Sequence, residues 1–201
     1  MILFEGKILI LLLFGIYYLQ AQGLHRIEEI FMEHSFWLNN LFAAVENLGE
    51  EGRVAVDFLR KRQRKVGFKK VRPNVGAFWT VFGNIRLNSH YYNYSSSLDD
   101  LKLKTLIIHE VCHLRQGFFT ALSVYGELEA WQLEFGVYRR VKGRYPNKAI
   151  EKLMELPLKY DRDVLAQAVH LMQEYAGKGY RADLLPLYPL GREIRYRFTR
   201  K

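Results

Sequence analysis

The residues with the clearest chemical potential form the pattern H-E-x-x-H: His109, Glu110 and His113. Two histidines four positions apart lie on one face of an α-helix, so both imidazoles can bind the same metal ion. Glu110, beside the first histidine, is placed to reach a metal-bound water. A Zn²⁺ ion lowers the pKa of such a water toward ~7, and a nearby carboxylate can then accept its proton. The pattern therefore predicts a metal centre that activates water for hydrolysis.

A tetrahedral catalytic zinc site needs a third protein ligand and an open position for water. Gln116-Gly117 can end the first helix, and apolar residues recur at helical spacing from about residue 121 to 137. A second helix packed on the first would offer Glu127 or Glu129 to the metal. These two carboxylates point about 200° apart around a helix, so only one can face the histidines.

The residues resemble the zincin metallopeptidases, and specifically the gluzincin branch, in which a later helix supplies a glutamate. Several members carry E-x-x-A there, matched by Glu127-Leu128-Glu129-Ala130. The resemblance implies that His109, His113 and Glu127 bind one Zn²⁺ ion, with Glu129 as the alternative third ligand, and that Glu110 is the general base. It also implies a peptide or protein substrate. Trp131 stands where many members carry Asp or Asn to support a ligand.

The resemblance further implies an α+β, zincin-like fold that is mostly helical, with a small sheet or hairpin beside the active helix. Two β-rich runs, 77–82 and 85–92, predict a hairpin joined by Gly83-Asn84. By resemblance this hairpin could pair with an extended peptide, and a purely structural hairpin is the alternative. The polar stretch Ser95–Asp100 predicts the N-cap of the active helix near Ser97 or Leu98. His90 and Tyr125 are the candidates for contacting the substrate or transition state, although rim packing is the preferred role for His90.

Helical spacing predicts further helices over residues 24–48, from about Val54, over 148–154 and over 161–175. The first is expected to end at Gly49 and Gly52. The basic run 60–65 could grip phosphates or an anionic membrane, but a solvated helix end is the preferred interpretation because no base-stacking platform accompanies it. We expect residues 184–190 to be extended, and residues 192–201 to form an edge strand or a basic arm.

Length, charge and cysteine content limit the number of domains, the kind of partner and the possible cross-links. With 201 residues, of which 49% are hydrophobic, the chain can bury one sizeable core, so we predict a single catalytic domain over residues 24–201. The net charge of +9 suggests an anionic partner. Cys112 is the single cysteine and excludes an internal disulfide.

Residues 1–23 contain an apolar run that fits a signal peptide, a membrane anchor or a core helix. Secretion or membrane association is the preferred location, and the cytoplasm is the alternative. A second class of function also fits the sequence: a non-catalytic zincin-fold protein that docks through basic faces on a membrane or nucleic acid. Glu110 favours catalysis, because a structural metal site needs no general base.

Overall fold

The computed structural model describes residues 32–177 and 179–199. The chain divides into two compact units, residues 1–40 and 41–201. In the first unit, residues 32–40 are helical, and the apolar segment predicted over residues 1–23 lies outside the described residues. Among the described residues, no helix has the length and apolar character needed to cross a membrane.

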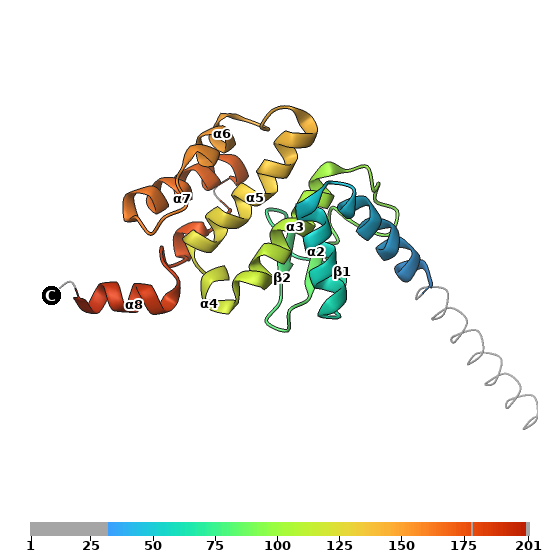
Figure 1. Cartoon of the computed structure of the whole chain (residues 1–201), viewed down its shortest axis with the longest axis horizontal. Coiled ribbons are helices and arrows are strands. Elements are labelled where there is room, and N and C mark those ends of the chain that lie inside the picture. The colour runs from blue at the N-terminus through green and yellow to red at the C-terminus, as the bar shows by residue number, and fades with distance from the viewer. Residues whose placement is uncertain (1–31, 178, 200–201) are drawn as a thin grey trace, which may run out of the picture. The chain divides into compact units, whose positions relative to one another are not determined.

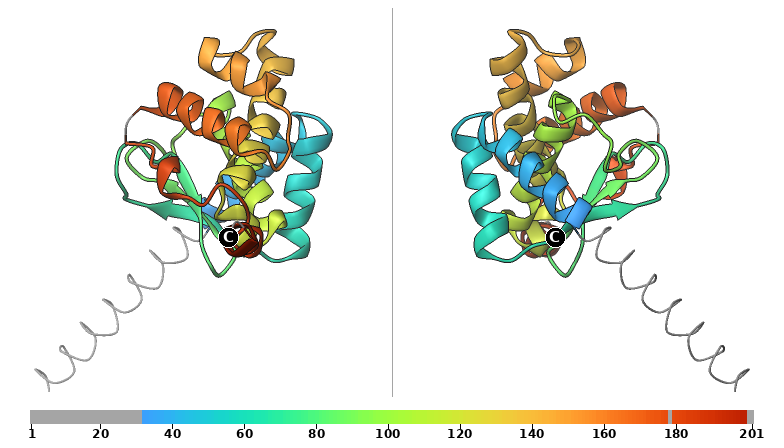
Figure 2. Two further views of the ribbon diagram at one scale, coloured as in Figure 1. Left: turned by 90° about the vertical axis from the view of Figure 1, so that its left-hand side faces the viewer. Right: turned by 90° about the vertical axis from the view of Figure 1, so that its right-hand side faces the viewer.

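The larger unit is mostly helical with one small sheet, which confirms an α+β composition (Figures 1 and 2). After a helix that ends at residue 46, the elements follow in this order: α2 (Glu50–Lys61), β1 (Val66–Lys69), β2 (Ala77–Trp79), β3 (Ile85–Asn88), α3 (Leu101–Gln116), α4 (Phe118–Ala121), α5 (Val124–Lys142), α6 (Lys148–Glu155), α7 (Arg162–Ala176), the 3₁₀ turn η1 (Ala182–Leu184) and α8 (Leu190–Thr199).

The sheet has the strand order β1-β3-β2. The predicted pairing of residues 77–82 with 85–92 is confirmed as the antiparallel pair β2–β3, with Trp79 opposite Ile85. Its connection is longer than the predicted Gly83-Asn84 turn. Thr80 forms the base of a five-residue loop, because its backbone N–H donates to the Asn84 carbonyl (2.8 Å) and its hydroxyl accepts from the Asn84 N–H (3.1 Å).

One prediction before the sheet is wrong. Gly52 does not end a helix but lies buried inside α2, where a Cβ atom would stand 1.9 Å from the Val45 carbonyl oxygen. Glycine is therefore required for the close approach of α2 to the preceding helix. The preferred interpretation of the basic run as a solvated helix end agrees with the structure: α2 ends at Lys61 and residues 60–63 are exposed. Residues 66–69 then form β1, parallel to β3.

The helix that carries the H-E-x-x-H pattern is α3. Its N-cap is Asp100, whose side chain accepts a hydrogen bond from the Lys102 N–H, so the helix begins later than predicted. Gly117 follows its last residue, as expected. Because α2, the sheet and α5 all pack on α3, the helix is buried on several sides, including Leu103, Ile107, Ile108 and Val111.

The helices after α3 form the other part of the core. Apolar side chains of α5, α6 and α7 pack together, among them Leu128, Phe135, Ile150, Leu153, Leu165 and Met172. Of the two C-terminal alternatives, the edge strand is wrong, because residues 190–199 form the helix α8. Glu193 anchors this helix: its buried carboxylate accepts from Arg197 (3.0 Å) and pairs with Arg162 (3.4 Å).

Candidate metal centre

The two histidines of α3 face the same point. His109 and His113 are both buried, and their Nε2 atoms lie 3.0 Å apart. The four-residue spacing places them one helical turn apart on the side of α3 that contacts α5. The predicted metal would lie on this side.

Helix α5 adds a carboxylate to the pair. The Glu127 Oε1 atom lies 3.5 Å from His113 Nε2, and Oε2 lies 3.9 Å from His109 Nε2. Ser123 caps the helix by accepting from the Gly126 N–H (3.1 Å), which places Glu127 in the first turn. A Cβ atom at Gly126 would stand 2.1 Å from the Thr120 carbonyl oxygen, so the tight packing of α5 on α4 needs glycine.

The donor spacing fits one ion. One donor atom from each of His109, His113 and Glu127 lies within 4.8 Å of the others. A tetrahedral zinc ion with bonds of about 2.0–2.2 Å holds its donor atoms about 3.3–3.6 Å apart, close to the distances between these side chains. Two imidazole nitrogens and one carboxylate are also a donor set that zinc accepts.

A second carboxylate of α5 supports His109. Glu134 Oε2 lies 3.0 Å from His109 Nδ1, and both side chains are buried. A carboxylate at the second ring nitrogen orients a ligating histidine and increases its basicity. The resemblance implies that the residue supporting a ligand lies at position 131, but the supporting carboxylate lies at position 134. The signal was present, because residues seven apart share one helical face.

Gln116 supports His113 from the end of α3. Its Oε1 lies 3.1 Å from His113 Nδ1, while its amide group donates to the Gly126 carbonyl (2.9 Å) and to Glu129 Oε2 (3.0 Å). Glu129, the alternative third ligand, thus contacts Gln116 and lies outside the group of three. Nδ1 of each histidine therefore lies close to a polar partner, through an ion-pair contact without hydrogen-bond geometry for His109 and a hydrogen bond for His113, and both Nε2 atoms turn toward the shared point.

Two residues hold Glu127 from the other side. The Trp131 indole donates to Glu127 Oε2 (3.3 Å) and to the Tyr180 hydroxyl (3.0 Å), and that hydroxyl donates to the same carboxylate oxygen. Burial raises the pKa of Tyr180 well above its usual value near 10, and the Glu127 charge adds to this, so the hydroxyl stays protonated. Tyr180 follows α7, and no spacing in the sequence connects it to the metal pattern.

Glu110 is buried beside this group and is only partly satisfied. Its Oε2 atom has no hydrogen-bond partner among the described residues, and the carboxylate accepts from the Trp79 backbone N–H. Burial raises the pKa of Glu110 to about 7, while the charge of His109 lowers it and those of Glu127 and Glu134 raise it. An unpartnered buried carboxylate oxygen is costly, so a polar ligand such as water is expected at this point.

The two histidines differ in their proton affinity. Burial lowers the pKa of His109, but Glu134, Glu110 and Glu127 raise it more, to about 9. Burial lowers the pKa of His113 to about 4. Near neutral pH the metal-free site would therefore hold a proton on His109 that a metal ion must displace.

Three other residues considered from the sequence lie elsewhere. Tyr125 stacks on Tyr160, with ring centroids 4.3 Å apart, and His90 is exposed beside Tyr91. Neither is among the residues that line the cavities beside the histidines. Cys112 is buried, and burial raises the pKa of its thiol to about 12, so the thiol remains protonated.

Cavities lie on both sides of the group. One of about 710 Å³ is lined by His109, Glu110 and aromatic side chains that include Trp131, Tyr175 and Tyr180. A smaller one of about 230 Å³ is lined by His113, Trp79 and Phe118. Strand β2 connects them, because Ala77 borders the first and Trp79 the second.

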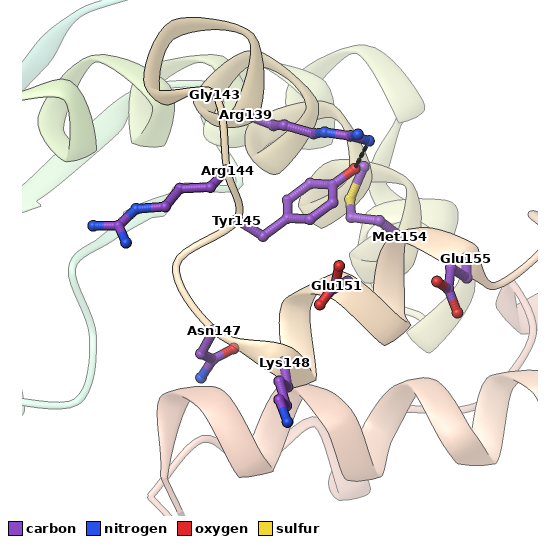
Figure 3. Close-up of a pocket in the computed structure, with 9 residues that line it drawn as sticks. All are labelled: Arg139, Gly143, Arg144, Tyr145, Asn147, Lys148, Glu151, Met154 and Glu155. Carbon is purple, nitrogen blue, oxygen red and sulfur yellow. Dashed lines mark hydrogen bonds between the residues drawn. The ribbon is translucent and has the colours of Figure 1, made fainter.

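A further cavity lies at the other end of α5, between that helix and α6 (Figure 3). The Arg139 guanidinium lies over the Tyr145 ring, 4.9 Å from its centroid, and donates to its hydroxyl (3.1 Å). Glu151, Glu155 and Lys148 line the same space, and all three are exposed. Because these acidic and basic side chains are all exposed to water, the lining of this cavity contains no buried charged group that needs a ligand.

Comparison of the chain with protein-family models, with curated proteins and with solved structures gives no match.

Proposed function

We propose that the chain is a zinc-dependent peptidase with a zincin-like, gluzincin-type site. The observation that carries the proposal is the convergence of His109, His113 and Glu127 beside the unpartnered oxygen of Glu110. A non-catalytic metal site would gain nothing from a buried, partly unsatisfied carboxylate next to the ligands. Such a group costs stability, and a role in proton transfer accounts for it.

The chemistry divides between the ion and the protein. A bound zinc ion supplies a water of lowered pKa and polarises the peptide carbonyl. Glu110 accepts a proton from the attacking water and later gives it to the leaving amine. Its pKa of about 7 in the metal-free protein would fall when a cation binds nearby, because an opposite charge favours the carboxylate.

The supporting residues orient the ligands. Glu134 and Gln116 engage the Nδ1 atoms of His109 and His113, which leaves both Nε2 atoms directed toward the metal position. Trp131 and Tyr180 engage Glu127 Oε2 and leave Oε1 toward His113. The four supporting side chains are all buried or half-buried, so the ligands are held in place before a metal binds.

The substrate peptide is proposed to lie along β2. This strand is at the edge of the sheet, and the Thr80–Asn84 and Asn88–Gly76 hydrogen bonds direct the even-numbered residues toward β3. By alternation, the backbone groups of Ala77 and Trp79 face the free edge. The Trp79 N–H already donates to Glu110, so an extended peptide would add as another strand through the backbone of Ala77 and the Trp79 carbonyl. The larger cavity beside Glu110 is lined in part by six aromatic side chains and would then accept an apolar substrate side chain.

The test is metal analysis together with peptide cleavage for the wild type and Glu110→Gln. We expect both proteins to retain one zinc ion and the variant to lose about 10²–10⁴-fold in cleavage rate. Glu155→Gln is the matched control, since Glu155 is exposed on α6 and contacts none of the site residues. Absence of metal from the wild type, or full cleavage by Glu110→Gln, would contradict the proposal.

A further inference from the structure

Exposed apolar side chains gather in three segments of the larger unit. They belong to the β2–β3 loop, to α4 with the residue after it, and to α8. The most exposed are Phe82 (79%), Phe198 (74%) and Val81 (71%). We call the full set the apolar face: Val81, Phe82, Phe118, Phe119, Leu122, Leu190, Ile194 and Phe198.

These segments are neighbours in space. Val81 and Phe82 line the smaller cavity together with Phe118, and Phe118 contacts Phe119 edge-on (5.6 Å between ring centroids). Helix α4 in turn packs against α8. In Figure 1, α4, α8 and the loop after β2 all lie toward the lower end of the unit. The apolar face is therefore one surface region.

Helix α8 displays its apolar stripe outward. Leu190, Ile194 and Phe198 recur every four residues, which places them on one side of the helix, and all three are exposed. The inward side is held instead by the polar pair Glu193 and Arg162 and by Tyr196, whose ring lies 4.5 Å from the Arg162 guanidinium carbon. A helix held to its protein by an ion pair and an aromatic side chain, with its apolar stripe in solvent, resembles helices that lie in a membrane interface.

Basic residues surround the apolar face. Residues 60–65 contain five Lys or Arg, residues 114–123 contain one, and residues 186–199 contain three. Arg60 and Lys61 pair with Glu46 and Asp57, and Arg197 pairs with the buried Glu193, so the basic character of this surface rests on the other six cations. Arg64 donates to the Phe82 carbonyl (2.9 Å), which places the first group beside the loop tip. Arg195 and Arg197 flank the stripe of α8 in sequence.

We propose that the apolar face docks on a membrane containing anionic phospholipids. The apolar side chains would enter the boundary between headgroups and acyl chains, and the surrounding cations would bind lipid phosphates and carboxylates. A second copy of the chain fits less well, because the same cations would then meet one another. The docking does not depend on the peptidase proposal. It would place the His113 side of the candidate site next to the lipid, since His113 lines the same cavity as Phe82.

Site-specific fluorescence on the full chain tests the proposal. An environment-sensitive probe is attached at Phe198→Cys or Phe82→Cys, with Val141→Cys as the control, because Val141 is exposed on the distal part of α5. Cys112 is buried and is not expected to react. With vesicles of phosphatidylcholine containing about one part in three phosphatidylserine, we expect a blue shift and quenching by brominated lipids at 198 and 82 and neither at 141.

A binding measurement completes the test. The double variant Ile194→Glu, Phe198→Glu should bind these vesicles about tenfold or more weakly, whereas Val141→Glu, Leu158→Glu should bind as the wild type. Because residues 1–31 are common to all variants, differences report on the apolar face. Equal probe signals at all three positions would overturn the proposal. So would wild-type protein that binds vesicles of pure phosphatidylcholine as strongly as vesicles with phosphatidylserine. A concentration-dependent shift at position 198 without vesicles would assign the face to self-association instead.

Discussion

The two ends of α5 carry polar side chains under opposite conditions. Glu127, in its first turn, and Glu134, near its middle, face α3 with little exposure to solvent, and the neighbouring Glu110 has an unpartnered oxygen. Near its end, Arg140 is exposed and pairs with Glu51 (2.9 Å between Nη1 and Oε1) while donating to the Leu48 carbonyl. Polar groups at the second end are satisfied by one another and by water. At the first end they need an additional ligand, and this difference identifies the candidate site.

The largest effect is expected for Glu127→Gln. The substitution keeps the size of the side chain but removes the charge that binds a cation. We expect the affinity for Zn²⁺ to fall by more than about 100-fold, which exceeds the usual effect of supporting residues. Isothermal titration with zinc measures it. Glu151→Gln, on α6 beside the other end of α5, is the control and should bind zinc as the wild type does. Equal losses of zinc affinity in both variants would show that Glu127 has no specific role in binding the ion.

A smaller loss is expected for Glu134→Gln. Glu134 contacts His109 Nδ1 at 3.0 Å and does not reach the metal position, so its charge acts through the imidazole. Loss of such a partner commonly lowers metal affinity about 10–100-fold. The same titration measures it. An unchanged affinity would show that the contact does not orient His109.

Metal binding should depend on pH. His109 has a pKa of about 9 in the metal-free protein, so below that pH zinc displaces about one proton, and its affinity should rise about tenfold per pH unit between pH 7 and 9. Titrations in buffers of different ionisation enthalpy count the released proton. The dependence should weaken in Glu134→Gln, because loss of the Glu134 charge lowers the pKa of His109.

The stability of the metal-free protein should fall with rising pH, whereas its affinity for zinc should rise. The folded-state pKa of His109 is raised, so its contribution to stability is complete below about pH 6.5 and is lost as pH rises through about 9. Glu110, raised to about 7, loses its contribution between about pH 4.5 and 7. The melting temperature without metal should therefore fall from pH 6.5 to 9, and saturating zinc should reduce that fall. A metal-free protein that becomes more stable over this range would contradict the assignment.

The smallest effect is expected at the distal end of α5. Arg140→Ala removes an exposed ion pair with Glu51, and such pairs contribute at most about 1 kcal/mol. Denaturant unfolding should show a loss below that value, and zinc affinity should be unchanged. A reduced zinc affinity would mean that the two ends of α5 are coupled.

Local patterns in the sequence determined the helical pair and the identity of the central residues. The four-residue spacing placed His109 and His113 on one face, and the apolar periodicity and the caps predicted most of α3, α5, α6 and α7, because these depend on contacts within a few residues. The same reasoning reached both Glu127 and Glu129 but did not choose between them.

Tertiary packing decided the rest. The close contact of α5 with α4 at Gly126 sets the rotation of α5, which turns Glu127 and Glu134 toward α3 and Glu129 toward Gln116. Tyr180 reaches Glu127 from 53 residues away, through the packing of the segment after α7. Likewise, α8 is joined to α7 where the buried Glu193 pairs with Arg162. Such contacts join residues distant in sequence, and neither spacing nor composition encodes the rotation of one helix against another.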